Sequence, residues 1–411
     1  MQDTDVCHLL GSGLKRRLHC NGRVRVGLSA DPLINKRLTN RLTEPLMTSP
    51  FMTLQEIVQQ ARKRLPRGEW DYLAGAAETE TTLRRNRLAY DRLALRARVM
   101  SNVSQVQLQR KFLGVDLRLP VLLAPIGSLQ MFDAGGGLTS ARAAAQFGVM
   151  QILSSVCQPD FETVARECPG PRVYQLYLHG TEDWAMETFA RAKAAGYTAL
   201  CLTADTQVYS RRERDILKRW VPLAARQEGT AQPKRPTHTL QNAMSWELVR
   251  RIKDRFGLPM IVKGIACAED AELAVQNGVD VVYVSNHGGR QLDHGQATLD
   301  MLPEIVKAVA GRATVVCDGG IMRGTDVLKA LALGADAVGI GRLEVLAMAA
   351  GGVPGIVRML ELLETEMQLN LASMGLNAID QLTPASVVPA QPVGLPGVLS
   401  AFPLLAEDYG T

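Results

Sequence analysis

From residue 120 onward, short apolar runs alternate with longer stretches in which apolar residues recur every three to four positions. This alternation is typical of parallel strands joined by crossover helices. Helices are expected between the strands, among others at 138–147, 184–195, 268–276 and 324–333. Eight strand-helix units over about 220 residues favour an α/β fold of the closed (β/α)8 TIM-barrel type over an open doubly wound sheet. The predicted strands are 121–124, 151–153, 174–178, 199–203, 260–263, 281–285, 314–318 and 337–340.

The segments around this repeat predict the domain layout. Helices are expected at 53–65 and 82–93, before the first strand. The polar segment 227–242 carries Gly229, Pro233 and Pro236 and predicts a mobile loop. From Leu382 onward, a Pro-rich tail of low charge is expected to run over the surface. We therefore expect a leader at 1–50, a barrel domain at 51–388 and a tail at 389–411.

Charge concentrates at the start of the chain. The formal net charge is +5, and residues 1–50 hold eight Lys or Arg against four acids. We interpret this stretch as a disordered extension or an over-long start, with Met47 or Met52 as alternative starts. A transit peptide is the weaker interpretation, because such peptides are poor in acids. A nucleic-acid partner would rest on this leader alone, so none is expected.

Hydropathy and cysteine usage restrict the class further. No uninterrupted apolar run approaches the roughly 18 to 20 residues that span a bilayer, so a soluble protein without a membrane partner is expected. The seven cysteines form no CxxC and no pattern with His. Neither a metal site nor a disulfide framework is predicted, and a cytoplasmic location fits best.

Polar residues follow the ends of the predicted strands. The carboxyl ends of barrel strands meet at one face, where active sites form. We therefore expect a functional site there, built in part from Gln175, Tyr177, Thr203, Asp205, Lys263, Ser285, His287 and Asp318.

The densest cluster of candidate chemistry is the segment 285–293. His287 is suited to act as a general base near neutral pH, and Arg290 can bind a carboxylate with two parallel hydrogen bonds. Gly288 and Gly289 would let the backbone approach a flat ligand. A lone His is more often structural, but an Arg beside it at a strand end favours function.

Two further features have less specific meanings. Lys263 could be a Schiff-base nucleophile, a cation facing a developing negative charge, or a surface lysine, and the sequence leaves these open. The segments 318–320 and 341–342, after predicted strands seven and eight, are Gly-rich and carry Arg323 and Arg342 nearby. They match the phosphate site that barrels often build from these two loops.

Taken together, segments 203–206, 211–213, 262–264, 285–293 and 318–320 resemble the FMN-dependent L-2-hydroxy acid oxidase and dehydrogenase family, over about Thr53 to Val388. The family includes glycolate oxidase, lactate oxidase and mandelate dehydrogenase. The resemblance implies that His287 is the base and that Asp205 stabilises its protonated form. It also implies that Arg212 and Arg290 bind the substrate carboxylate and that Tyr72 and Tyr177 donate hydrogen bonds to the substrate.

The same resemblance implies a cofactor site for FMN. Lys263 would lie beside the flavin ring as a fixed positive charge. Asp318 would contact the ribityl chain. The ring would be lined by Pro125, Ile126, Gly127, Ser154, Gln175, Thr203 and Ser285, and the phosphate would lie near Gly319, Gly320, Arg323, Gly341 and Arg342.

Several positions depart from the family pattern. Met322 stands where the family has a first arginine after Asp-Gly-Gly, which predicts weaker phosphate binding, and Leu343 replaces the usual Pro. Val156 replaces the Trp of glycolate oxidase, so a wider pocket and a bulkier substrate are expected. Gly127 replaces the Ala usual in oxidases and leaves oxygen reactivity open.

The expected function is FMN-dependent oxidation of an L-2-hydroxy acid, such as lactate, to a 2-oxo acid by a homotetramer, with O2 as acceptor. The alternatives are a lactate monooxygenase-like enzyme, a soluble mandelate dehydrogenase-like enzyme and an impaired FMN-binding relic. A Schiff-base aldolase using Lys263 is a weaker alternative.

Overall fold

The computed structural model describes residues 51–220 and 240–407. The chain separates into two units, Met1–Ser49 and Pro50–Thr411, and all described residues belong to the second. The predicted leader 1–50, residues 227–239 of the predicted loop and residues 408–411 of the predicted tail lie outside the described residues.

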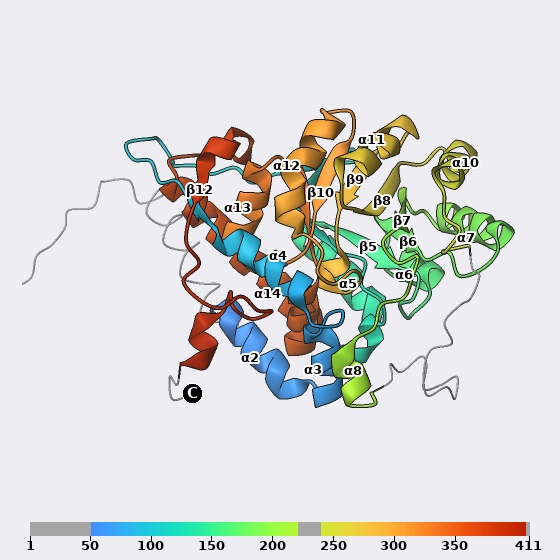
Figure 1. The fold of residues 1–411 in the computed structure, drawn as a ribbon, viewed down its shortest axis with the longest axis horizontal. Helices are drawn as coiled ribbons and strands as arrows, with labels where there is room; N and C mark the ends of the chain where they lie inside the picture. The colour runs from blue at the N-terminus through green and yellow to red at the C-terminus, as the bar shows by residue number, and fades with distance from the viewer. Residues whose placement is uncertain (1–50, 221–239, 408–411) are drawn as a thin grey trace, which may run out of the picture. The chain divides into compact units, whose positions relative to one another are not determined.

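Eight parallel strands close into a barrel in the order β10-β11-β4-β5-β6-β7-β8-β9, which confirms the predicted fold (Figure 1). Predicted and observed strand ends differ by at most two residues. Two strands differ by two residues at their ends: β6 stops before the predicted end, and β8 continues past Lys263 through a register shift. The strands are β4 (Val121–Leu123), β5 (Met150–Ser154), β6 (Val173–Leu176), β7 (Ala199–Thr203), β8 (Met260–Ile265), β9 (Val281–Val284), β10 (Thr314–Cys317) and β11 (Ala337–Ile340).

The barrel strands are buried on both faces, as their continuous apolar sequences require. Alternate residues such as Ile152, Cys201 and Val316 form one compact cluster. Their neighbours pack outward in a larger cluster that includes the surrounding helices. The antiparallel hairpin of β2 (Arg110–Phe112) and β3 (Val115–Leu117) adds Phe112 and Leu117 to the first cluster.

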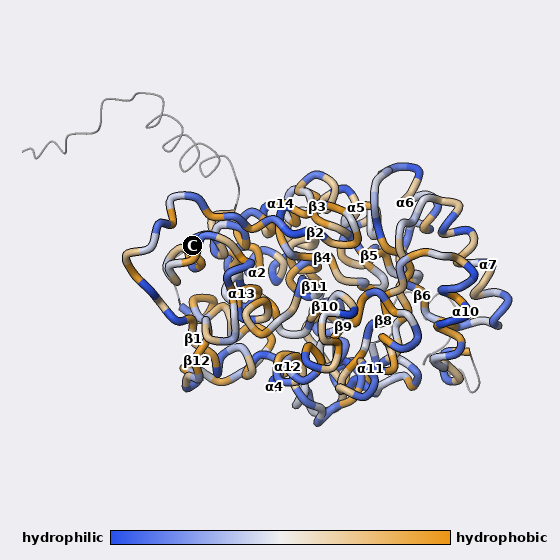
Figure 2. Tube along the Cα trace, turned by 90° about the horizontal axis from the view of Figure 1, so that it is seen from above, coloured by the Kyte–Doolittle hydropathy of each residue, from blue (hydrophilic) through white to orange (hydrophobic). Residues whose placement is uncertain are grey.

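Among the described residues, each barrel strand is followed by a helix that packs on the outside of the barrel. Colours for hydrophilic and hydrophobic residues alternate along the outer helices in Figure 2, as expected when one face of each helix packs on the strands. In α10, Ser245 caps the first turn and Gly257 ends the helix in the left-handed region. The helices are α5 (Gly136–Phe147), α6 (Phe161–Glu167), α7 (Glu182–Ala194), α10 (Trp246–Phe256), α11 (Ala268–Gln276), α12 (Thr298–Val309), α13 (Gly324–Ala332) and α14 (Arg342–Ser373).

In the part of the chain that the structure describes, the helices before the barrel are α2 (Leu54–Arg64), α3 (Arg67–Ala74) and α4 (Thr81–Asp91). Thr53 and Glu56 form a capping box at the start of α2, which packs on α14. The short helix α8 (Glu213–Leu217) contacts α3. The remaining one-turn elements are η1 (Leu129–Met131), η2 (His287–Gly289), η3 (Ile379–Gln381), η4 (Pro384–Ser386) and η5 (Pro403–Ala406).

Helix α14 is, among the described residues, the one helix long and apolar enough to cross a membrane by length and composition. Of its most apolar 18-residue window, 72% is buried inside the protein. Its backbone leaves helical geometry at Gly351 and Gly352. Such burial is typical of an apolar helix that packs inside a folded protein.

The C-terminal tail only partly follows its prediction. Val393 and Leu395 are exposed, as expected for a surface segment. However, β12 (Val387–Pro389) pairs with β1 (Leu93–Leu95), and the side chain of Phe402 is buried in the core. The prediction of a surface course is therefore wrong at Phe402. Removing a large aromatic side chain from water is favourable, so the tail packs this residue into the core.

Candidate active site

A cavity of about 410 Å³ opens at the carboxyl ends of the barrel strands. Seven side chains with candidate chemistry line it, drawn from helix α3, from strand β8 and from the loops that follow four other strands. They are Tyr72, Tyr177, Arg212, Lys263, His287, Arg290 and Asp318. All seven are residues that the sequence predicts for the site, and the fold brings them together.

His287 is held by its neighbours in a strained backbone conformation, with φ of +57°. Asn86 and Asn286 exchange two side-chain hydrogen bonds of 2.9 and 2.8 Å, which fix the turn that contains His287. The backbone N–H of His287 donates to Ser285 Oγ at 3.1 Å. This geometry aims the imidazole into the cavity.

His287 Nδ1 lies 2.9 Å from Asp205 Oδ1. Burial lowers the pKa of His287 below its usual range, even though Asp205 acts to raise it. Burial alone would raise the pKa of Asp205, but His287 and Lys263 lower it overall. The imidazole is therefore neutral near pH 7, and with Nδ1 held by an ionised carboxylate, Nε2 is the nitrogen that can accept a proton.

Lys263 is a buried cation between two carboxylates. Its Nζ donates to Ser285 Oγ at 2.7 Å and lies 3.6 Å from Asp318 Oδ2 and 4.0 Å from Asp205 Oδ2. Burial would lower the pKa of Lys263, but Asp318 and Asp205 raise it overall. A Schiff-base nucleophile needs a lowered pKa, so the structure favours a fixed positive charge among the alternatives left open by the sequence.

The guanidinium groups of two half-buried arginines flank the ring of Tyr72. The Cζ atoms of Arg212 and Arg290 lie 5.5 and 4.7 Å from the ring centroid. Burial would raise the pKa of the Tyr72 hydroxyl, but the two arginines lower it overall. Arg212 Nε is buried and has no hydrogen-bond partner among the described residues. A carboxylate between Arg212 and Arg290 would supply the missing partner.

Arg342 and Arg290 bind the C-terminal carbonyls of α3. Arg342 donates to the carbonyls of Leu73, Gly75 and Gly288 at 2.7 to 2.9 Å, and Arg290 donates to those of Tyr72 and Gly75. Helix ends leave such carbonyls without internal partners, and cations stabilise them. Burial, followed by the nearby Arg290, lowers the pKa of Arg342 to about 9. The site thus holds more cations than anions and favours an anionic ligand.

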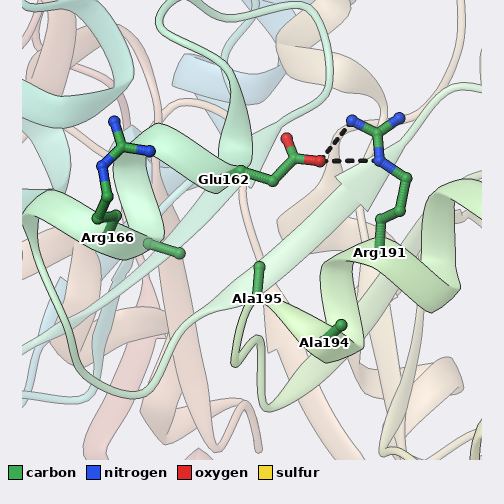
Figure 3. Close-up of a pocket in the computed structure, with 6 residues that line it drawn as sticks. Glu162, Arg166, Arg191, Ala194 and Ala195 are labelled. Carbon is green, nitrogen blue, oxygen red and sulfur yellow. Dashed lines mark hydrogen bonds and ion pairs between the residues drawn. The ribbon is translucent and has the colours of Figure 1, made fainter.

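A second hollow, of about 400 Å³, lies on the outside of the barrel between α6 and α7 (Figure 3). Arg191 Nε donates to Glu162 Oε1 across it at 2.8 Å. The remaining residues that line it are Ala165, Arg166, Ala194 and Ala195. None of the residues assigned to the site by the sequence lines this hollow.

Comparison with known proteins identifies the family of this arrangement. A model of the family "FMN-dependent dehydrogenase" matches residues 61–389, more than half of the chain. The chain belongs to this family. It is 39% identical over 350 residues to a peroxisomal (S)-2-hydroxy-acid oxidase of Oryza sativa subsp. japonica, covering 82% of this chain and 96% of the relative.

Solved structures give the same assignment. A mandelate oxidase structure matches with a TM-score of 0.76 and 33% identity, covering 84% of this chain and all of the other. A mutant of an active (S)-mandelate dehydrogenase chimera matches with a TM-score of 0.75 and 32% identity, covering 82% and 99%. The solved structures that resemble this chain therefore include one named as an oxidase and one named as a dehydrogenase.

The residues present fit the ring system of FMN. Gln175 Nε2 and Oε1, Thr203 Oγ1 and Asp318 Oδ1 are buried and have no hydrogen-bond partner among the described residues. Unpaired buried polar atoms are costly unless a ligand satisfies them. Ser154 pairs in register with Gln175, and Thr203 pairs with Lys263, so these polar residues lie on adjacent strands. Pro125, Ile126, Gly127, Gly319, Gly320 and Gly341 line the cavity itself.

The predicted phosphate end is only partly assembled. Arg342 and Met322 line the cavity, but Arg323 does not belong to its described lining. The guanidinium of Arg323 lies 2.6 Å from Glu366 Oε1, and its Cζ lies 5.8 Å from the Phe402 ring centroid. The structure therefore does not bring the Arg323 side chain to the cavity, because an acidic partner on α14 and the buried tail hold its guanidinium. Its place near the phosphate stays a prediction.

Some residues of the cavity were not predicted as site residues. His179 and Tyr209 both line it. His179 follows Tyr177 by two residues at the end of β6, so its position was a usable signal. Tyr209 lies between Asp205 and Arg212, but only the folded loop shows that its ring reaches the Arg212 guanidinium, with Cζ 5.2 Å from the centroid.

Proposed function

We propose that this member of the FMN-dependent dehydrogenase family oxidises an L-2-hydroxy acid to the corresponding 2-oxo acid, with O2 as the electron acceptor. The observation that carries the proposal is the convergence of the His287–Asp205 pair, Arg212 and Arg290 on one cavity. A proton acceptor beside two carboxylate-binding groups is what a 2-hydroxy acid requires.

In the proposed mechanism, Arg212 and Arg290 bind the substrate carboxylate, and the hydroxyls of Tyr72 and Tyr177 hydrogen-bond to the substrate. This anchoring places the α-carbon and its hydroxyl beside His287 Nε2. Nε2 takes a proton from the substrate, and Asp205 stabilises the resulting imidazolium through Nδ1. FMN, when bound, accepts the two electrons that leave the substrate.

Tyr177 and Lys263 have supporting roles in this proposal. Burial, followed by Asp205, raises the pKa of Tyr177 far above its usual value, so its hydroxyl stays protonated and can donate a hydrogen bond. Lys263 provides a permanent positive charge at the cavity wall, where it would oppose negative charge on a bound flavin ring. Ser154, Gln175, Thr203, Ser285 and Asp318 would hold the ring and the ribityl chain.

The acceptor is the least constrained part of the proposal. The oxidase names of the rice relative and of the mandelate oxidase structure support O2. Gly127 keeps a monooxygenase-like or dehydrogenase-like enzyme as an alternative. Because of Met322, an impaired FMN-binding relic is also an alternative. Arg342 is then the guanidinium at the phosphate end, since Arg323 is paired with Glu366.

The experiment is an anaerobic visible spectrum of the purified holoprotein, with glycolate, lactate and mandelate added one at a time. Bleaching of the oxidised flavin band near 450 nm supports the proposal. Fast reoxidation on admission of air supports O2 as acceptor, whereas slow reoxidation points to a dehydrogenase. If FMN neither copurifies nor binds when added, the relic alternative replaces the proposal.

Two finer features also remain proposals. We propose a homotetramer from the family resemblance, and light scattering after gel filtration tests it. We propose a cytoplasmic location, although the rice relative is named as peroxisomal. The five cysteines of the described residues are unpaired, which suits a reducing compartment. A fluorescent fusion of the full chain decides the location.

A further inference from the structure

Gln241 is a buried polar residue that the proposed mechanism does not use. It lies near the end of the segment 227–242, in the part that the structure describes, and is 4% exposed. Its side-chain amide makes three hydrogen bonds, each to a residue that ends or follows a barrel strand. A buried amide with its hydrogen bonds made holds its partners in fixed relative positions.

One group of contacts joins Gln241 to the loop after β6. The backbone N–H of Leu178 donates to Gln241 Oε1 at 2.7 Å, and the backbone N–H of Gln241 donates to the carbonyl of Leu178 at 2.9 Å. Leu178 is fully buried, and its neighbour Tyr177 lines the catalytic cavity. The backbone N–H of Tyr177 itself donates to Ser155 Oγ at 3.2 Å. The backbone is therefore fixed at Tyr177 and at the residue that follows it.

The other group of contacts closes the turn that carries Asp205. Gln241 Nε2 donates to the carbonyl of Thr203 at 2.8 Å and to Thr206 Oγ1 at 3.0 Å. These two partners lie on either side of Asp205 in the chain. A Cβ atom placed on Gly264 of β8 would lie 2.7, 2.8 and 3.0 Å from the backbone N, Cβ and Cγ of Asp205, so Asp205 also packs directly on the backbone of β8.

The carboxylate of Asp205 depends on this turn for its orientation. Its Oδ1 lies 2.9 Å from His287 Nδ1, whereas its Oδ2 is buried and has no hydrogen-bond partner among the described residues. After burial, the charge of Asp205 is the main influence that raises the pKa of Tyr177, so the carboxylate and this phenol lie close enough to interact. Gln241 thus joins the backbone segments of two residues whose side chains interact in the cavity.

We propose that Gln241 is a positioning residue for the oxidation, which fixes the Asp205 carboxylate against His287 by closing the turn 203–206 and anchoring it to Leu178. The inference rests on the proposed function. Without the amide, the Asp205 carboxylate samples further orientations and stabilises the protonated base less well. Small displacements of catalytic groups have large effects on rate, so the oxidation slows.

The pKa of His287 reports the position of Asp205. Burial is the largest influence on this pKa and lowers it. Of the charged groups that act on it, Asp205 from the loop after β7 raises it, and Lys263 of β8 and Arg212 before α8 lower it. Helix α4 packs on the turn that contains His287 through the uncharged Asn86. Asp205 is therefore the partner whose loss of order lowers the pKa of His287 further.

The test compares the wild-type holoenzyme with Gln241→Met, which keeps a similar side-chain volume and removes the three hydrogen bonds. The assay is anaerobic flavin reduction by a saturating 2-hydroxy acid, expressed per bound FMN and measured as a function of pH. We expect the rate to fall about tenfold or more. The acid limb of the pH profile, where His287 is protonated and cannot accept a proton, should move to lower pH.

The matched control is Gln151→Met. Gln151 is 3% exposed, and its Nε2 donates to the carbonyl of Gly137 in α5 at 2.8 Å, so it is a glutamine of the same burial that contacts the helical shell. This variant should lose stability in urea, as Gln241→Met does, but keep the wild-type rate per bound FMN and the wild-type acid limb.

Thr206 isolates one of the three hydrogen bonds and carries the test if Gln241→Met does not fold. Thr206→Val removes the acceptor of Gln241 Nε2 and should change the rate and the acid limb in the same direction as Gln241→Met. Thr206→Ser keeps the hydroxyl and should retain the wild-type profile. In the double variant, the effects of Gln241→Met and Thr206→Val should be less than additive, because both remove the same bond.

A readout without turnover is an NMR titration of the histidine-labelled holoprotein, in which His287→Asn assigns the His287 signal. The pKa of His287 should be lower in Gln241→Met than in the wild type and unchanged in Gln151→Met. An unchanged His287 pKa and acid limb in Gln241→Met, with only flavin content or stability reduced, would overturn the inference. If no 2-hydroxy acid bleaches the flavin, the proposed function fails, and the titration still tests whether Gln241 positions Asp205.

Discussion

The phosphate end of the FMN site makes the sharpest prediction, because at Met322 an uncharged side chain replaces an arginine of the family pattern. Met322 is 4% exposed and lines the cavity together with Gly320, Gly341 and Arg342. The phosphate of FMN is close to doubly charged near pH 7. Arg342 would meet it without help from Arg323, which is bound to Glu366. We therefore predict that Met322→Arg binds FMN more tightly than the wild type.

The magnitude follows from the contact that would be added. A hydrogen bond to a charged group contributes about 1.5 to 3 kcal/mol, which corresponds to a Kd about 10- to 100-fold lower. Repulsion between the new guanidinium and Arg342 weakens the apoprotein, so its melting temperature should fall while that of the holoprotein rises. Part of the gain should disappear at high ionic strength.

The assay is quenching of flavin fluorescence when apoprotein is titrated with FMN. Riboflavin, which lacks the phosphate, is titrated in parallel, and Met322→Leu serves as the uncharged control of similar volume. The gain should occur with FMN and not with riboflavin. An equal gain for both flavins, or none for either, would refute the assignment of Met322 to the phosphate end.

Three further predictions address the base, a buried acid and the tail. Asp205→Asn removes the charge that stabilises protonated His287, so the rate of anaerobic flavin reduction should fall at least about 100-fold while flavin content is retained; an unchanged rate would exclude Asp205 from the mechanism. Burial raises the pKa of Glu344 to about 8, so the free energy of unfolding should fall by about 3 kcal/mol between pH 4.5 and 7, because the unfolded chain releases this proton and the folded chain keeps it. Urea unfolding of Glu344→Gln should lack that part of the pH dependence, and identical pH profiles would contradict the burial argument. Phe402→Ala should lower the free energy of unfolding by about 3 kcal/mol and Leu395→Ala by less than 0.5 kcal/mol, measured in urea; equal effects would mean that the tail is not part of the core.

The site residues could be predicted because the reactive residues of barrel enzymes lie at the carboxyl ends of the strands. Asp205, Lys263 and His287 each follow an apolar run, and parallel strands bring their carboxyl ends to one face whatever the loops do. The contacts between those residues could not be predicted in the same way. The 2.9 Å contact of His287 with Asp205 and the carbonyl partners of Arg342 join segments 54 to 269 residues apart in sequence.

Arg323 and Phe402 show the limit of sequence pattern. An arginine after Asp-Gly-Gly suggested a phosphate ligand, and a Pro-rich tail suggested a surface course. The surface prediction failed at Phe402, and the predicted phosphate ligand Arg323 instead has Glu366 of α14 and the ring of Phe402 as its partners in the structure. No local sequence pattern predicts that the segments of Arg323, Glu366 and Phe402 come into contact.

The sequence by itself determined the barrel, its family and the set of polar residues at the strand ends, because periodic burial and strand-end position are local properties of the chain. Only the tertiary structure decided which nitrogen of His287 is free and which partners bind the Arg323 guanidinium. These depend on packing between distant segments, where a few ångströms determine whether a charge meets a partner, a ligand or empty space.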